Sequence, residues 1–436
     1  MNADKIALRG ATLSFRADPF FTPLAEAMVY HQDGLVVIEQ GRIVASGAAA
    51  ELLPGLDPAV EVRHEADSLI LPGFVDTHVH FAQIEMVAAF GEQLIDWLRR
   101  YTFPTEARFA DRSHADAVAQ VFLREQLRNG ITTACVFCTV HPQSVDALFA
   151  AAAGYDLRIL AGKVCMDRHA PPDLLDSAER AYRESLALIE RWHGRGRAEY
   201  VITPRFAPTS SPAQLEALGA LAQAYPGMAI QSHLSENRAE LAWIRELFPD
   251  SANYTDVYRR HGLLRPRAIY GHGVHLDDEE FALLADSGSA LAHCPTSNFF
   301  LGSGCFDLQR ARRAARPVRV GLGSDLGAGT SFSMLRIMAA AYQAAQLNGY
   351  ALSAPQAFYL ATRGGAEALG LADRIGALEP GKEADLVVLD LRPTPFVDFR
   401  MRQADSLEEV LFVLMTLADD RAVRATYVAG RQVSPD

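Results

Sequence analysis

Three features are scarce in this 436-residue sequence: long apolar runs, cysteine and clustered positive charge. It has no uninterrupted apolar stretch of the roughly 18 residues that a membrane-spanning helix needs. The segment MNADKIALRG lacks an apolar core behind a basic start, so we expect no secretory signal there. Acidic residues outnumber basic ones by 53 to 41, and the net charge of −12 disfavours nucleic acid and anionic membranes as partners. A small-molecule substrate is therefore expected.

Only five cysteines are present, an odd and small number for a chain of this length. This argues against a disulfide framework and favours free thiols in the cytoplasm. Cys135 and Cys138 form a C-x-x-C pattern, but the upstream H-x-E and the preceding proline of cytidine-deaminase-type zinc sites are missing. In a strand these two residues point to opposite faces, so we predict that they are core residues.

Between about residues 68 and 325, short β-branched or apolar runs alternate with amphipathic segments, a pattern typical of parallel strands joined by helices. Helices are predicted over 174–192, 215–225 and 277–286 from their spacing and closing glycines. Eight such units over about 250 residues predict an α/β fold, a (β/α)8 TIM-like barrel. The eight predicted strands lie in 70–80, 132–140, 157–166, 199–206, 228–236, 268–276, 289–295 and 318–325.

Both ends of the chain have a different pattern, with alternating strands and turn residues at 5–15, 34–47, 384–391 and 424–433. We expect residues 1–68 and 376–436 to form a small β-sandwich domain, and residues 69–375 to form the catalytic barrel. The segment 83–105 is predicted to be a βα loop of more than the usual length, and such loops are often functional. The fold of residues 392–420 stays open at this point.

Five metal-binding side chains fall at the carboxyl ends of predicted strands: His78, His80, His233, His272 and Asp325. A lone strand-end histidine is more often a structural residue, but in a barrel these four strand ends open onto one mouth. His78 and His80 also point to the same face, because strand side chains alternate. Several imidazoles and a carboxylate form the ligand set of a hydrolytic metal site. Zinc is the first expectation and iron the second.

Several motifs resemble the amidohydrolase superfamily, namely PGFVDTHVH, GHGVHL, HCPTSN and GLGSD. Within it, the stretch from His80 to Asp111 and the motifs KVCMD, VITPRF, QSHLSENRAEL and NYTDVY are similar to guanine deaminases. The resemblance implies a barrel with a flanking β-sandwich, one catalytic metal, usually zinc, and a homodimer. It also implies hydrolysis of guanine to xanthine and ammonia.

A second metal is not expected. Binuclear members of the superfamily often have a carboxylated lysine at the end of strand four, where this chain has Thr203-Pro204-Arg205-Phe206. Lys163 in strand three is the alternative bridging residue, but a structural role is favoured for it. One metal per subunit is therefore predicted.

The catalytic roles are assigned to Glu236, Asp325 and His272. By resemblance, Glu236 is not a ligand but the proton shuttle between water and the purine ring. Asp325 is expected to bind the metal and to orient or deprotonate the water. For His272, metal binding and stabilisation of the charged intermediate remain alternatives.

Substrate contacts are predicted for Arg205, which can donate to the carbonyl oxygen of guanine, and for Gln83, which can donate and accept at the ring edge. Phe206 and Trp97 are expected to flank the ring. The metal-site residues His233, Glu236 and Asp325 are also expected to face the substrate. Two alternatives remain: another amidohydrolase deaminase, acting on an adenosine-type, cytosine, pterin or triazine substrate, and a non-catalytic binding barrel.

Overall fold

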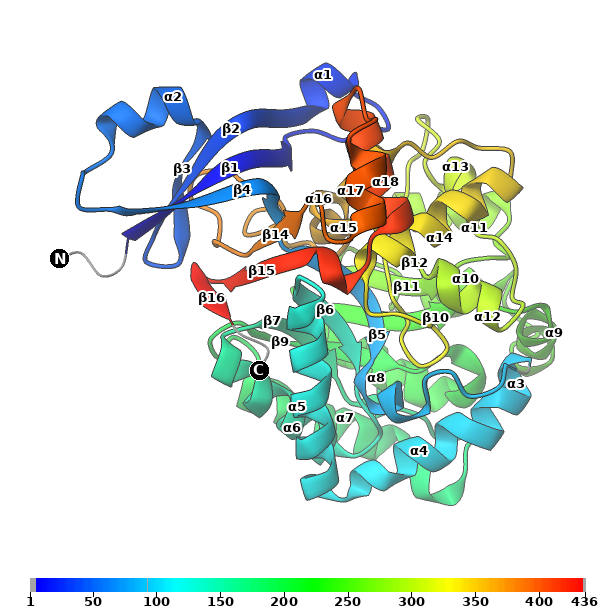
Figure 1. Ribbon diagram of the computed structural model, residues 1–436. Coiled ribbons are helices and arrows are strands. Elements are labelled where there is room, and N and C mark those ends of the chain that lie inside the picture. The colour runs from blue at the N-terminus through cyan, green and yellow to red at the C-terminus, as the bar shows by residue number, and fades with distance from the viewer. Residues whose placement is uncertain (1–4, 92, 434–436) are drawn as a thin grey trace.

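A computed structural model describes residues 5–91 and 93–433. Residues 1–4 and 434–436 of the predicted terminal domain, and residue 92 of the predicted loop, lie outside the described residues. Two sheets organise the chain, a parallel barrel and a mixed sheet built from both termini (Figure 1). The predicted fold class is therefore confirmed.

Eight parallel strands form a nearly closed barrel with the predicted order along the chain. Their apolar, almost wholly buried sequences explain this arrangement, because both faces of a barrel strand are covered. The strands are β5 (Phe74–His80), β6 (Ile131–Phe137), β7 (Arg158–Gly162), β9 (Ala198–Pro204), β10 (Ala229–Leu234), β11 (Ala268–His272), β12 (Ala290–His293) and β13 (Arg319–Leu322). A short strand, β8 (Val164–Cys165), pairs with β9.

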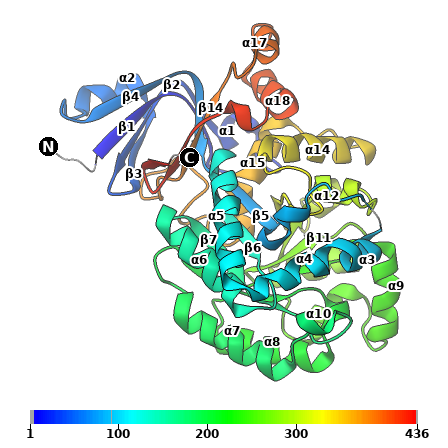
Figure 2. The ribbon, with the colours of Figure 1, turned by 60° about the horizontal axis from the view of Figure 1, so that its bottom comes forward.

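Helices surround the barrel strands, and Figure 2 shows α5 to α8 along its outer side. The predicted helices over 215–225 and 277–286 are present as α8 and α11, whereas the helix predicted from residue 174 begins after its N-cap Ser177. The crossover helices are α5 (Arg112–Arg128), α6 (Pro142–Tyr155), α7 (Ala178–Trp192), α8 (Pro212–Ala224), α9 (Arg238–Leu247), α10 (Tyr254–Arg260), α11 (Asp278–Ser287), α12 (Pro295–Phe300), α13 (Leu308–Ala311), α14 (Met334–Leu347), α15 (Ala354–Ala361) and α16 (Arg363–Ala368).

The second sheet has seven strands in the order β16-β15-β14-β4-β1-β2-β3. It joins the two ends of the chain, because β14 pairs antiparallel with β4. Its strands are β1 (Lys5–Phe15), β2 (Met28–Glu39), β3 (Arg42–Ala48), β4 (Glu61–Pro72), β14 (Leu386–Asp390), β15 (Val423–Val428) and β16 (Arg431–Val433), with short helices α1 (Leu24–Ala27) and α2 (Ala49–Leu52) in its connections. The predicted domain boundaries remain a prediction.

Residues 392–420, whose fold the sequence left open, contain two helices, α17 (Pro395–Met401) and α18 (Leu407–Leu417). Helix α18 contacts α14 and α15 of the barrel. Its sequence LEEVLFVLMTL is apolar enough to be buried on that side, and Leu411 and Leu414 are fully buried. This packing attaches the C-terminal part of the chain to the barrel wall.

The segment after β5, predicted as a long loop, is largely helical. It contains the 3-10 turn η2 (Phe81–Met86), α3 (Leu94–Trp97), the π turn η3 (Leu98–Thr102), α4 (Phe103–Ala107) and the 3-10 turn η4 (Arg108–Ala110). Other 3-10 turns are η1 (Leu53–Gly55), η5 (Pro172–Leu174), η6 (Ala207–Thr209) and η7 (Asp420–Ala422). From Leu94 to Ala110 the helical turns follow one another without a gap but change from α to π, back to α and then to 3-10, which disturbs the regular periodicity by which a helix is recognised in a sequence.

Among the described residues, none of the helices combines the length and the apolar character that crossing a bilayer would require.

Gly73 marks the point where the chain passes from the mixed sheet into the barrel, between β4 and β5. Its amide donates to Asp385 O at 2.8 Å, and a Cβ atom at this position would lie 2.2 Å from Thr132 Oγ1. Because β6 passes so close to residue 73, only glycine fits at this position.

We expect Gly73→Ala to destabilise the protein by about 1–3 kcal/mol, because the added methyl group overpacks this junction. The thermal unfolding midpoint measures the effect. Gly227→Ala is the matched control, since nothing lies within 4 Å of a Cβ there. Equal midpoints for both variants would contradict the proposed role of Gly73.

Candidate metal centre and substrate pocket

The barrel strands bring four potential ligands together at one end. His78 lies in β5, His233 in β10 and His272 at the end of β11, while Asp325 follows β13. One ligand atom from each of these buried residues lies within 4.8 Å of all the others. The structure thus contains a buried His/His/His/Asp metal site, as expected from the strand-end positions.

His80, the fifth predicted ligand, is adjacent to this group although it is not part of the four-residue cluster. Its Nε2 lies 3.1 Å from Nε2 of His233 and 3.4 Å from Oδ1 of Asp325. The imidazole therefore faces the same space. Its assignment as a ligand stays a prediction.

The donor set fits a divalent cation. Burial lowers the pKa of His78, of His233 and of His80, the last to about 4, so these rings are neutral and their lone pairs are free. Nε2 of His78 and Nε2 of His272 make no hydrogen bond. Buried polar atoms normally have partners, and a metal ion would satisfy both nitrogens.

In His233 and His272 the second ring nitrogen, Nδ1, has a hydrogen-bond partner. Nδ1 of His233 donates to the carbonyl oxygen of Arg205 at 2.7 Å, and Nδ1 of His272 lies 2.9 Å from Oδ1 of Asn298. Such partners fix the tautomer that leaves Nε2 free to bind a metal. Sequence reasoning missed Asn298, which lies in the HCPTSN motif and has no strand-end position.

Asp325 provides the carboxylate that the histidines share. Oδ1 lies 3.3 Å from Nε2 of His78, and Oδ2 lies 3.7 Å from Nε2 of His272. The imidazoles hold the pKa of Asp325 well below its usual range despite burial. Its amide also donates to His78 O at 2.8 Å, so the residue links β13 to β5.

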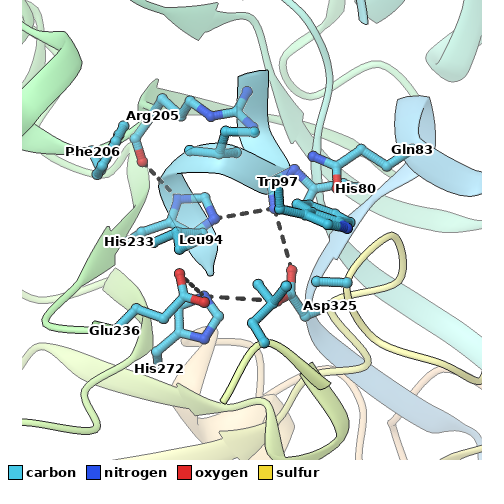
Figure 3. A pocket seen from close by; sticks show the side chains of 13 residues that line it. His80, Gln83, Leu94, Trp97, Arg205, Phe206, His233, Glu236, His272 and Asp325 are labelled. Carbon is cyan, nitrogen blue, oxygen red and sulfur yellow. Dashed lines mark hydrogen bonds and ion pairs between the residues drawn. The ribbon is translucent and has the colours of Figure 1, made fainter. Parts of the chain in front are cut away.

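Beside the ligands lies a cavity with about 390 Å³ of empty space, a volume that includes its opening to solvent. Figure 3 shows predicted residues arranged around it. Its walls include His80, Gln83, Trp97, Arg205, Phe206, His233, Glu236, His272 and Asp325, together with Leu94, Leu98, Leu301 and Ala328. Of the predicted site residues, only His78 is absent from this lining. Phe90, from the same segment as Trp97, is 77% exposed and lies outside the lining.

Glu236 faces the cavity beside the ligands. Oε2 lies 3.4 Å from Nε2 of His272, and Oε1 accepts a hydrogen bond from the Ser303 hydroxyl at 3.3 Å. Burial, followed by the nearby Asp325 carboxylate, raises the pKa of Glu236 to about 8. A carboxyl group with a raised pKa can hold and release a proton near neutral pH.

Gln83 and Arg205 lie on the cavity wall and share a partner that sequence reasoning missed. Glu106 in α4 accepts from Gln83 Nε2 at 2.9 Å and from Arg205 Nη1 at 2.6 Å. Glu106 directly follows the predicted loop 83–105, and a single glutamate there carried no signal of this role. Lys163, in contrast, is buried in an ion pair with Asp176, in keeping with the structural role favoured for it.

A family model described as "Amidohydrolase family" matches residues 69–433. The chain is also 50% identical over 410 residues to the guanine deaminase of Escherichia coli (strain K12), which spans 94% of this chain and 93% of that protein. The chain belongs to the guanine deaminases of the amidohydrolase family. The resemblance inferred from the motifs is thereby confirmed.

Solved structures agree with this assignment. The structure of E. coli guanine deaminase superposes with a TM-score of 0.95 at 48% identity, covering 98% of this chain and 99% of that one. A guanine deaminase from C. acetobutylicum with bound guanine in the active site gives 0.88 at 28% identity, covering 99% and 100%. An adenosine deaminase from Xanthomonas campestris with bound zinc gives 0.84 at 25% identity, covering 98% and 92%.

Two buried histidines on neighbouring strands allow a matched test of the metal site. His272 belongs to the four-residue cluster, whereas His293 at the end of β12 does not, although both its ring nitrogens lack partners. We expect His272→Ala to weaken metal binding by at least about 10–100-fold, measured by metal content after dialysis. His293→Ala should retain the metal. The reverse pattern would contradict the assigned cluster.

Proposed function

We propose that this protein hydrolyses guanine to xanthine and ammonia. The observation that carries the proposal is one cavity lined both by the site residues His233, His272 and Asp325 and by Gln83 and Arg205, which share a hydrogen-bond partner. The similarity to the guanine deaminase of E. coli and to the C. acetobutylicum structure with bound guanine supports the same substrate.

One zinc ion per subunit is the proposed cofactor, with iron as the alternative. His78, His80, His233, His272 and Asp325 would hold it, and the four-residue cluster favours metal binding by His272 over the alternative of stabilising the intermediate. A zinc ion supplies Lewis acidity that lowers the pKa of a bound water toward neutrality. The zinc in the X. campestris relative supports this choice of metal.

The reaction replaces the exocyclic amine of guanine with oxygen from water. In the proposed mechanism, Glu236 accepts a proton from the attacking water and delivers it to the ring nitrogen beside the reacting carbon. Asp325 orients the water and accepts the second proton of its oxygen, and this proton passes through Glu236 to the amine, which leaves as ammonia. The raised pKa of Glu236 suits a group that must both accept and donate.

Binding of the base is assigned to the cavity wall. Arg205 would donate to the carbonyl oxygen of guanine, and Phe206 and Trp97 would cover the faces of the ring. The leucines Leu94, Leu98 and Leu301 exclude water from the same space. An active site closed to water strengthens each of these polar contacts.

Three further assignments are part of the proposal. All five cysteines are free thiols, four of them buried, which supports a cytoplasmic enzyme. The family resemblance supports a homodimer. The proposed division is a catalytic barrel at 69–375 with a flanking β domain made from 1–68 and 376–436, and the pairing of β4 (Glu61–Pro72) with β14 favours moving the first boundary to Gly73.

Ammonia release from guanine, adenine, adenosine, cytosine and a triazine tests the substrate assignment. Purified zinc-loaded protein should release ammonia from guanine, and chelated protein should not. Turnover of another amine with guanine inert would refute the substrate and retain the metal site. No turnover of any compound would refute the reaction class.

Glu236→Gln should keep the fold and the bound metal but lower kcat by about 10²–10⁴-fold, because the amide cannot shuttle a proton. Steady-state kinetics and metal analysis of the same preparation measure both properties. Glu246→Gln, at an exposed position of α9, is the control and should match the wild type. Unchanged turnover in Glu236→Gln would remove Glu236 from the mechanism.

A further inference from the structure

Glu106 joins two cavity side chains that come from distant parts of the chain. Gln83 lies in η2 and Arg205 directly follows β9, and each is bound by a different oxygen of the same carboxylate. Glu106 is 1% exposed, Gln83 and Arg205 are each 3% exposed, and Glu106 is not part of the cavity wall. It therefore acts on a ligand only through these two residues.

The contact with Glu106 fixes the orientation of the Gln83 side-chain amide. An ionised carboxylate only accepts hydrogen bonds, so the amide nitrogen must face Glu106 and the amide oxygen must face away. A flipped amide would bring two oxygens together in a buried place, which is costly. The sequence predicted that Gln83 could either donate or accept at the edge of the base. With its amide nitrogen bound to Glu106, only the amide oxygen remains free, and it can only accept.

The surroundings restrict the amide from a second side. A Cβ atom at Gly327, in the turn after β13, would lie 2.2 Å from Oε1 of Gln83. Gly327 has a φ of +130°, a conformation open to glycine. The oxygen therefore has room only because this position lacks a side chain, and the amide is confined between α4 and the turn.

The same carboxylate orients Arg205. One of its guanidinium nitrogens donates to Glu106, and the guanidinium carbon lies 5.6 Å from the centre of the Phe103 ring. Two contacts hold the planar group, and its remaining N–H groups are available to the cavity. The wall thus presents a fixed donor next to a fixed acceptor.

We propose that Glu106 is a positioning residue that sets substrate specificity, by holding Gln83 as an acceptor and Arg205 as a donor toward the base. The proposal rests on the proposed function. Guanine has a carbonyl oxygen and ring N–H groups that match such a pair. 2-Aminopurine has the same amine but lacks the carbonyl oxygen, and a buried donor left unpaired penalises its binding.

The test compares Glu106→Gln with Glu85→Gln, a control in the same segment whose partners are Arg108 and His114. Two quantities are measured, the KM for guanine and the inhibition constant of 2-aminopurine against guanine turnover. In Glu106→Gln the KM for guanine should rise by about 10–100-fold, while the inhibition constant changes by less than about threefold. Glu85→Gln should keep both values, and metal content should be equal in all proteins.

The outcomes separate the two claims. A wild-type protein inert toward guanine would overturn the proposed function and this inference with it. If the wild type turns over guanine and Glu106→Gln changes neither the KM for guanine nor the inhibition constant of 2-aminopurine, the Glu106 role alone is overturned. An equal loss for both ligands would also overturn it, because it would indicate a merely structural contact.

Removal of one partner of a buried ion pair is destabilising, so a second variant covers failure of Glu106→Gln to fold. Glu106→Asp keeps the charge but is one methylene shorter, so it cannot reach both partners at once. Glu106→Asp should fold, retain the metal and lose part of the preference for guanine over 2-aminopurine. If Glu106→Asp kept the wild-type ratio of the 2-aminopurine inhibition constant to the KM for guanine, the result would contradict the proposal.

Discussion

The contact between Asp325 and His78 is the constraint on which the site depends. The two residues meet at the seam between the last and the first barrel strand, where the amide of Asp325 donates to the carbonyl oxygen of His78. Thr77 strengthens the seam, because its hydroxyl donates to Leu322 O at 2.9 Å. The interaction that nearly closes the barrel therefore also brings the carboxylate to the imidazoles.

Three of the ten described non-glycine residues with a positive φ lie at the same place. Ser235, His272 and Asp325 have φ values of +50°, +75° and +46°, although none is glycine. Left-handed conformations of such residues cost free energy and persist only where the surrounding structure imposes them. Here the strained residues end or follow strands β10, β11 and β13, where the chain must turn sharply to direct side chains into one small space.

The sequence was sufficient for the parts of the account that depend on local pattern. The alternation of short apolar runs with amphipathic segments located all eight barrel strands. A position at the end of a strand identified His78, His233, His272 and Asp325. Contacts between distant residues were not predictable in this way. Glu106 reaches Arg205 across 99 positions, and nothing in the surrounding residues marks it. The helical turns of 81–110 were predicted as a loop, and α17 and α18 lie in residues whose fold was left open, because tertiary packing stabilises short helices that do not form alone.

The most direct test of the account is a crystal structure of the metal-loaded Glu236→Gln protein with guanine, with anomalous diffraction to locate the metal. The account predicts one ion held among His78, His80, His233, His272 and Asp325, the amine-bearing carbon of guanine facing it, and the Gln83 oxygen and Arg205 on the edge of the base. An ion elsewhere in the barrel, or guanine bound with that carbon turned away from the ion, would contradict the central claim.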